Sequence, residues 1–242
     1  MKSHVGLFYS LLLASVLYSA PIAGATPQGM DVQAQIKMTH WGIQKGSNHR
    51  ASSTVVLWLS EVPYDSGRAV SPPPGHFRMA QKNKGFSPHL LVVPLGSTVE
   101  FPNLDPFFHN VFSQFNGKRF DLGLYEAGST KGVRFDHEGV SYIFCNIHPE
   151  MAAVIVTLST PYFSISADDG HIVLHDVPPG TYEMHIWVEG SDAKQLDTIT
   201  RRVHIAASQT DLGTINLVTN DAVPAHKNKF DEDYRPDAST TY

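Results

Sequence analysis

The sequence predicts an all-β fold of the sandwich type. Short runs of β-branched and aromatic residues recur along the chain, and Gly, Pro, Asn or Asp stands at the ends of most of them. No long stretch shows the periodicity of an amphipathic helix. Repeated short strands separated by turn residues are typical of β-sandwiches.

Each apolar run is one expected strand. In chain order the expected strands cover residues 32–38, 53–60, 88–94, 97–103, 109–115, 131–136, 140–146, 152–158, 170–177, 181–190, 200–206 and 213–218. Alternate residues of a strand lie on opposite faces of its sheet. The alternation therefore predicts that Tyr142, Phe144 and Val140 share a buried face, as do Ile172 and Leu174.

Three polar or proline-rich stretches interrupt this pattern. Residues 64–77 include three consecutive prolines, which predicts a connecting loop or linker. Asp168 and Asp169 precede a glycine and are expected to form a turn rather than a pair of catalytic carboxylates. The segment from Pro224 onward is charged and aperiodic, which predicts a disordered or loosely docked tail.

The N-terminal residues have the order of an export signal. Lys2 and His4 precede an apolar run from Val5 to Leu17, and the small residues Ala23 and Ala25 follow. The run is shorter than the roughly 20 residues that a spanning helix needs. We expect cleavage after Ala25, a periplasmic or secreted mature protein, and no stable membrane insertion after cleavage.

Charge and cysteine content restrict the function. Acidic residues outnumber basic ones, 23 to 18, so the formal net charge is −5, which argues against a nucleic-acid partner. The chain has one cysteine. An unpaired thiol in an oxidising compartment invites damage unless something occupies it, and a bound metal would do so.

That cysteine begins a run of potential metal ligands. Cys145, His148 and Met151 follow one another at three-residue steps and offer a thiolate, an imidazole and a thioether. These donors together suit copper as it cycles between two oxidation states. A second imidazole must come from another strand, and His109, near the start of an expected strand, is the best candidate.

Residues from about 79 to 158 resemble the cupredoxins, the blue copper proteins, and in particular the amicyanin-like and plastocyanin-like carriers. The resemblance rests on "FSPHLLVVPLGSTVEFPN", "HNV" and "FDHEGVSYIFCNIHPEM". It implies a Greek-key β-sandwich and one type 1 copper ion. It also implies His109, Cys145 and His148 as equatorial ligands and Met151 as the distant axial ligand.

Two neighbours of the ligands have expected roles. Asn110 matches the asparagine that, in the family, bridges the two ligand loops and lies near the cysteine sulfur. Such contacts orient the ligands and tune the metal. The fixed φ of Pro149 is expected to stiffen the loop between His148 and Met151.

The resemblance implies that the electron leaves through His148, whose ring edge can reach solvent in cupredoxins. The apolar residues expected to form a docking patch around it are Pro106, Phe107, Phe108, Ile147 and Pro149. The alternative is that Phe107 and Phe108 are buried and only shield the metal.

Residues 164–190, with "SADDGHI" and "VPPGTY", resemble the carboxypeptidase regulatory-like modules, which are transthyretin-type (prealbumin-like) β-sandwiches. In that family two strands come earlier, and "MDVQAQIKM" and "STVVLWLS" fit those roles. We therefore hypothesise that the copper domain is inserted into this second sandwich. Alternatively, residues 26–75 add strands to the cupredoxin. The pairing partners of Val55–Leu59 distinguish these possibilities.

The expected organisation follows from both resemblances. It comprises a signal peptide (1–25), N-terminal strands (26–75), a cupredoxin domain (76–158), a regulatory-like sandwich (159–222) and a polar tail (223–242). Ser164 and Ser166 lack a neighbouring catalytic pattern, so no activity is expected of the second sandwich.

The expected function is single-electron transfer without enzymatic activity, to a partner such as a cytochrome, an oxidase or a dehydrogenase. A copper delivery or storage protein is the main alternative, and an adhesion protein with structural copper is a weaker one. An accessory metal site is less favoured because the remaining histidines are scattered; they are His40, His49, His76, His89, His137, His171, His175, His185, His204 and His226.

Overall fold

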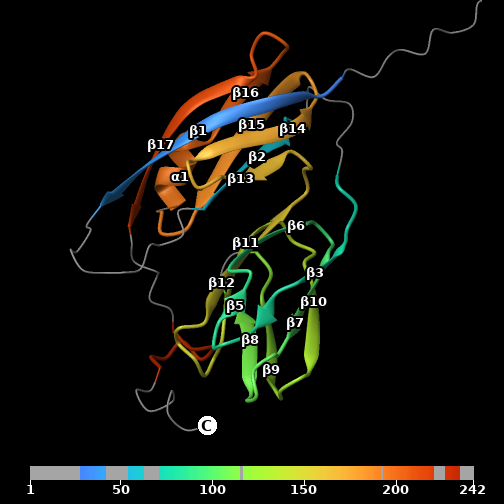
Figure 1. Ribbon diagram of the computed structural model, residues 1–242, viewed down its shortest axis with the longest axis vertical. Coiled ribbons are helices and arrows are strands. Elements are labelled where there is room, and N and C mark those ends of the chain that lie inside the picture. The colour runs from blue at the N-terminus through green and yellow to red at the C-terminus, as the bar shows by residue number, and fades with distance from the viewer. Residues whose placement is uncertain are drawn as a thin grey trace, which may run out of the picture.

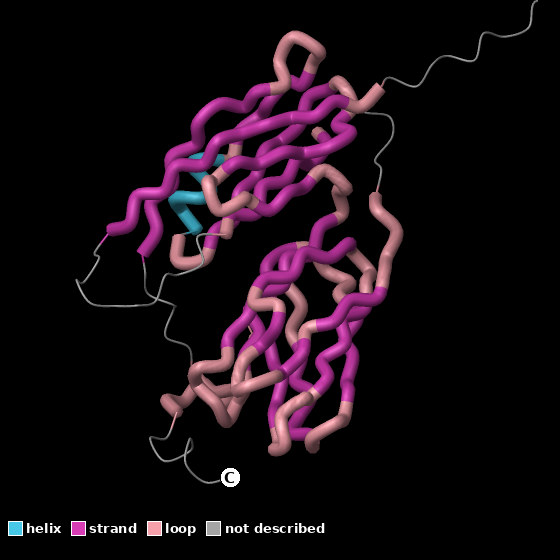
Figure 2. Tube along the Cα trace, viewed as in Figure 1, coloured by secondary structure: helices cyan, strands magenta, loops and turns pink. Residues whose placement is uncertain are grey.

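The computed structural model describes residues 28–41, 54–62, 71–114, 117–191, 193–220 and 227–234. These residues form two β-sandwiches, one above the other in Figure 1. The all-β prediction is confirmed, since helix within the described residues is confined to α1 (Ala193–Ile199), drawn cyan in Figure 2. The expected export signal lies outside the described residues.

The upper sandwich consists of a sheet in the order β14-β1-β17 and a sheet in the order β13-β2-β15-β16. Its strands are β1 (Met30–Trp41), β2 (Val55–Glu61), β13 (Phe163–Ile165), β14 (His171–Val177), β15 (Gly180–Val188), β16 (Arg201–Ile205) and β17 (Asp211–Asn220). One apolar cluster from both sheets fills the space between them. Ile172 and Leu174 are buried in it, as predicted.

The N-terminal strands pair with the C-terminal part of the chain. β2 pairs with β13 and β15, with Val55 opposite Val188 and Leu59 opposite Met184. β1 pairs antiparallel with β14 and parallel with β17. This is the pairing that the insertion hypothesis requires, because residues 71–158 lie between strands of the same two sheets.

The lower sandwich packs the sheet β6-β12-β11-β8-β9 against the sheet β10-β7-β3, with the small β4-β5 pair beside them. Its strands are β3 (His76–Arg78), β4 (Ala80–Gln81), β5 (Phe86–Ser87), β6 (Leu90–Pro94), β7 (Thr98–Pro102), β8 (His109–Ser113), β9 (Phe120–Tyr125), β10 (Thr130–Arg134), β11 (Gly139–Phe144) and β12 (Ala152–Leu158). The sequence did not predict β3, β4, β5, β9 or β13, which are short or carry turn-forming residues such as Gly123.

The prediction that Val140 and Tyr142 lie on the core face of β11 is wrong. Ser141, Ile143 and Cys145 are fully buried, and Ile143 and Cys145 belong to the core of the lower sandwich. Val140 and Tyr142 are only partly buried and pack instead against the apolar cluster between the two sandwiches. Both faces of β11 are covered, so alternation alone could not identify the inner one.

Apolar residues join the two sandwiches. The buried members of this contact are Val56 and Trp187 from the upper sandwich and Val92, Val154, Val156 and Leu158 from the lower one. The two sheets that meet here, β13-β2-β15-β16 and β6-β12-β11-β8-β9, thus place apolar side chains on their outer faces as well as their inner ones. Their mutual burial removes these side chains from water and holds the sandwiches against each other.

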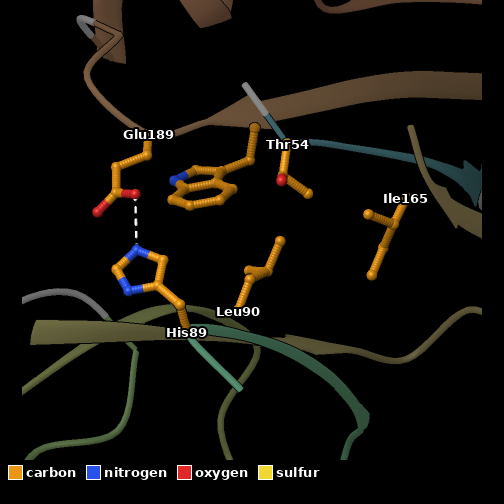
Figure 3. A pocket seen from close by; sticks show the side chains of 6 residues that line it. Thr54, His89, Leu90, Ile165 and Glu189 are labelled. Atoms are coloured by element: carbon orange, nitrogen blue, oxygen red, sulfur yellow. Dashed lines mark hydrogen bonds and ion pairs between the residues drawn. The ribbon is translucent and has the colours of Figure 1, made fainter. Parts of the chain in front are cut away.

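A cavity of about 280 Å³ lies at the edge of this contact. Figure 3 shows that Thr54, Ile165 and Glu189 of the upper sandwich face His89 and Leu90 of the lower one across it. His89 Nε2 and Glu189 Oε2 are 2.8 Å apart, so a hydrogen-bonded pair spans the two units.

The turn at residues 167–171 forms as predicted. The Gly170 N–H donates to the Ala167 carbonyl, and Asp169 Oδ1 accepts from the His171 N–H. Gly170 has φ +81°, and a Cβ there would lie 2.4 Å from the Ile36 carbonyl oxygen. Only glycine fits this position.

Two other connecting segments differ from expectation. Within the proline-rich stretch, residues 71–75 contain no strand, but β3 begins at His76. Residues 227–234, expected to be disordered or loosely docked, fold against the lower sandwich, where Figure 1 shows them in red. That expectation is wrong for these residues.

No helix among the described residues has the length and apolar character needed to cross a membrane.

Candidate metal centre

Three potential ligands converge at one end of the lower sandwich. His109 is the first residue of β8, Cys145 directly follows β11, and His148 lies in the loop between β11 and β12. β8 and β11 are antiparallel neighbours, with Phe112 opposite Phe144, so the start of one strand meets the end of the other.

The donor atoms have the separations that one metal ion requires. The Nδ1 atoms of His109 and His148 are 3.1 Å apart, and Cys145 Sγ lies 3.9 Å from the first and 3.7 Å from the second. Bonds of about 2.0 Å to nitrogen and about 2.3 Å to sulfur, at angles between tetrahedral and trigonal, place nitrogens roughly 3.3–3.5 Å apart and nitrogen and sulfur roughly 3.5–3.7 Å apart, within about 0.2 Å of the separations here. The residues present therefore fit a bound metal ion.

All three donors are buried. His109 and Cys145 are fully buried, and His148 is 3% exposed. Burial raises the pKa of the Cys145 thiol, an effect that the backbone N–H groups of Asn110, Ile147 and His148 reduce. Burial, followed by the neighbouring His109, lowers the pKa of His148, which favours the neutral imidazole that a metal needs.

Met151 belongs to the same apolar core cluster as Cys145 and is fully buried. Its N–H donates to the His148 carbonyl (3.1 Å), and its carbonyl accepts from the Cys145 N–H (3.3 Å). The loop is thus closed on itself by backbone hydrogen bonds. The axial role of the Met151 thioether stays a prediction.

A carboxylate orients His109. Its Nε2 lies 2.8 Å from Asp105 Oδ2, so the ring donates its Nε2–H there and keeps the Nδ1 lone pair for a ligand. Burial by itself raises the pKa of Asp105, but the N–H groups of Lys84 and Asn83 and the His109 ring hold it below its usual value. Asp105 was not among the residues predicted from the sequence, although "DPFFH" places it four residues before His109.

Asn110 bridges the two ligand segments. Its Oδ1 accepts from the Asn146 N–H (3.2 Å), and its Nδ2 donates to Asp121 Oδ1 on β9 (2.7 Å). The side chain therefore ties β8 to the residue after Cys145, as the resemblance implies. The structure adds Asp121, which the sequence analysis did not select.

The two phenylalanines before His109 differ. The Phe107 ring is partly buried and lies edge-on to His109, with ring centroids 5.1 Å apart. Phe108 is 49% exposed. Phe107 therefore shields the donors, as one alternative predicted. Phe108 is available at the surface, as the other alternative, a docking patch, requires.

The other members of the expected docking patch are unequal in exposure. Pro106 and Pro149 are exposed, and Ile147 is partly buried. Leu104, which was not selected, is 49% exposed on the same loop as Phe108. The expectation that the ring edge of His148 reaches solvent does not agree with its burial. Phe107 packs against the His148 ring, with ring centroids 5.7 Å apart.

The His109, Cys145 and His148 group is the one cluster of three metal-binding side chains among the described residues. Other histidines pair with single carboxylates, as His137 does with Asp136 and His175 with Asp31. His49 and His226 lie outside the described residues.

The sequence matches no model of a protein family and no curated protein. Several solved structures are similar to it. A purple cupredoxin from Nitrosopumilus maritimus is 26% identical, with a TM-score of 0.31, over 34% of this chain and 99% of that one. A copper-containing nitrite reductase from Thermus scotoductus is 20% identical, with a TM-score of 0.33, over 50% of this chain and 28% of that one. A copper(I) form of an amicyanin variant is 17% identical, with a TM-score of 0.33, over 34% and 82%. The purple cupredoxin and the amicyanin variant match only about a third of this chain, and the reductase matches half of it.

Proposed function

We propose that the protein is an exported type 1 copper protein that carries single electrons between redox partners. The observation that carries the proposal is the convergence of Cys145 Sγ, His109 Nδ1 and His148 Nδ1 within 4.8 Å in a buried pocket. One thiolate and two imidazoles are the equatorial set that blue copper sites use, and Met151 supplies the weak axial donor.

When bound, copper would supply a one-electron couple, with copper(II) taking one electron from a reduced donor and copper(I) returning it to an oxidised acceptor. The residues of the chain hold the donors still through this cycle. Asp105 fixes the His109 ring, and Asn110 ties β8 to the loop that carries Cys145 and His148. A cage that does not rearrange favours fast transfer in both directions.

The carrier role is proposed over catalysis because the four proposed ligands, His109, Cys145, His148 and Met151, would fill the coordination that copper needs here. A catalytic metal site keeps an open position for water or substrate. The donors are also buried, with Phe107 between them and solvent. We propose that the partner, such as a cytochrome, an oxidase or a dehydrogenase, docks on the apolar surface beside the site, including Phe108 and Pro106.

A visible spectrum and a redox titration of the copper(II)-loaded mature protein test the proposal. We expect an intense blue to purple thiolate-to-copper band that is bleached by one electron per protein. Cys145→Ser should abolish the band, and His109→Ala should abolish or strongly shift it. The matched control is His175→Ala, which removes an exposed histidine of the upper sandwich and should leave the band unchanged. A native protein without this band would refute the copper assignment.

Metal delivery or storage is the alternative function. A carrier must keep its copper through oxidation and reduction, whereas a delivery protein must release it to a chelator or partner within minutes. The near-complete burial of the three donors favours retention. Rapid loss of copper(I) to an excess of chelator, with the band otherwise normal, would favour delivery.

A further inference from the structure

Residues 227–234, which we call the C-terminal strap, form a compact turn of their own. Asn228 Oδ1 accepts hydrogen bonds from the N–H groups of Phe230 (2.9 Å) and Glu232 (3.1 Å). The backbone of Asn228 closes the turn by bonding to Asp231 and Glu232. Lys227 and Asp231 add an ion pair at 3.5 Å. The strap is therefore locally ordered, not an extended tail.

The strap contacts the candidate metal centre through Tyr234 and Lys229. The Tyr234 hydroxyl donates to the carbonyl of Cys145 at 2.8 Å. The Lys229 N–H donates to Asn146 Oδ1 at 2.9 Å. These two contacts lie on the cysteine ligand itself and on the residue after it.

Lys229 also connects the strap to the neighbouring strands. Its Nζ lies 2.8 Å from Asp121 Oδ2 on β9, and its carbonyl accepts from Gln114 Nε2 just beyond β8. Asp121 in turn accepts from Asn110, the residue that bridges to Asn146. A closed ring of contacts thus runs from Lys229 through Asp121, Asn110 and Asn146 back to Lys229.

We propose that the C-terminal strap is a positioning element of the candidate copper site, and that Lys229 and Tyr234 are its positioning residues. The inference rests on the proposed function for its copper-dependent part. The strap holds the start of the ligand loop against β8 and β9, limits opening of the pocket over Cys145, and fixes the geometry in which the donors meet. It follows β17 in sequence, so the chain returns from the upper sandwich to close the site in the lower one.

The reason is local stability. The ligand loop spans residues 145–151 and is anchored internally by backbone hydrogen bonds at its two ends. A loop of this kind opens more readily than the strands around it unless other groups hold it. Movement of the loop away from the strap would break the contacts that Tyr234 and Lys229 make with Cys145 and Asn146, so these contacts stabilise the closed loop.

The first experiment needs no metal. The chain has a single cysteine, so an aromatic disulfide reagent such as 5,5′-dithiobis(2-nitrobenzoate) reports on the Cys145 thiol alone. In the metal-free full-length mature protein we expect slow labelling. Tyr234→Phe should speed labelling about two- to tenfold, the change that corresponds to losing one hydrogen bond. Lys229→Ala should act in the same direction, and a chain ending at His226 should react faster than either.

Three variants serve as controls. Tyr182→Phe removes an equivalent hydroxyl-to-carbonyl hydrogen bond, to Pro178, in the upper sandwich. Lys118→Ala removes a lysine–aspartate pair, with Asp136, elsewhere on the lower sandwich. Both should label at the native rate. Lys229→Arg keeps a cation beside Asp121 and should label at a near-native rate.

The second experiment uses the copper-loaded protein. Tyr234→Phe and Lys229→Ala should shift the reduction potential and the visible band and speed copper loss to a chelator, whereas Tyr182→Phe should change none of these. If the native protein forms no type 1 site, the proposed function fails but the labelling experiment still decides whether the strap closes the pocket. Native labelling rates in all strap variants, or equal acceleration in the controls, would overturn the proposal.

Discussion

The two sandwiches have similar apolar cores but treat buried polar groups differently. Among the described residues, ten of the twelve buried polar or charged side chains belong to the lower sandwich, and the upper one has only Thr160 and Thr219. Several of those in the lower sandwich gather at its metal-binding end, among them Asn103, Asp105, His109, Asn110 and His148. The upper sandwich is a conventional apolar core, whereas the lower one contains a hydrogen-bonded polar site.

This difference indicates how the site is maintained. A buried polar group destabilises a protein unless it is hydrogen-bonded. Asp105, beside the candidate metal centre, is paired with His109 and with the backbone N–H groups of residues 83 and 84. Three other buried polar atoms of the lower sandwich, Gln81 Oε1, Ser113 Oγ and Thr157 Oγ1, have no hydrogen-bond partner among the described residues. The upper sandwich offers the lower one an apolar contact surface. The strap, which follows its last strand, adds hydrogen bonds to the ligand loop. The two units should therefore respond differently to the same kind of perturbation.

Metal removal should produce the largest difference. The proposed function requires copper to bind the folded lower sandwich, so loading at about 1,000 times the dissociation constant should stabilise that unit by about 4 kcal/mol. Denaturant titrations of the loaded and metal-free proteins would measure this. The gain should be absent in Cys145→Ser, and an equal gain in that variant would show that copper binds elsewhere.

Truncation of a core residue in the upper sandwich should destabilise that unit and leave the candidate copper site unchanged. Leu57→Ala leaves a cavity in the fully buried core and should cost about 2–5 kcal/mol of that unit's unfolding free energy. Tryptophan fluorescence would follow this unit together with its contact to the lower sandwich, because Trp58 and Trp187 belong to strands of the upper sandwich and lie in the apolar cluster between the two. The position of the visible copper band should stay unchanged. A displaced band would mean that the two units are more tightly coupled than their separate cores indicate.

Asp105→Asn should weaken the site without removing a ligand. The amide can still occupy the space, but it cannot accept the His109 Nε2–H as a charged partner. Loss of such an orienting contact typically lowers metal affinity about 10- to 100-fold. Competition with a chelator would measure this, and the reduction potential should rise because His109 becomes a poorer donor to copper(II). Asp136→Asn, which alters an exposed carboxylate of the same sandwich, is the control.

The smallest expected effect concerns the contact between the sandwiches. The hydrogen bond to Glu189 raises the pKa of His89, although partial burial works against it. The contribution of the pair should therefore be complete below the usual histidine pKa of about 6.5 and be lost as pH rises through the raised value. Because both groups are partly exposed, the change should stay below about 1 kcal/mol.

Unfolding of the native protein and of Glu189→Gln, compared between about pH 5 and pH 9, would measure this effect. The difference between them should shrink as pH rises. Asp31→Asn removes an exposed pair with His175 away from the interface and is the matched control. A difference that grows with pH would contradict the assignment of a charged His89.

Most of the candidate ligands could be selected from the sequence because their signal is local. Cys145 and His148 lie within one short loop, together with Met151, whose axial role stays a prediction, and these residue types suit copper. His109 required one non-local step, the choice of a histidine near the start of another expected strand, and the resemblance implies the same residue. Asp105 was also within reach, since it stands four residues before His109 in the sequence.

The remaining contacts of the site could not be predicted in this way. Tyr234 is 89 residues from Cys145, and Lys229 is 108 residues from Asp121. A charged, aperiodic segment has the composition of a tail, and composition does not record that a specific surface exists to receive it. The outward apolar residues Val56 and Trp187 were missed as contact residues for the same reason, because their partners belong to the other sandwich.

The sequence by itself determined the all-β class, most strand positions and the chemical identity of the donors. Strand periodicity and ligand type are properties of neighbouring residues, and they hold whichever way the strands assemble. Only the tertiary structure decided that β1 and β2 join strands beyond residue 160, which face of β11 lies in the core, and that the strap returns to the cysteine loop. Those outcomes depend on which apolar and polar surfaces complement each other across long sequence separations, and the free energy of that fit exists only in the assembled fold.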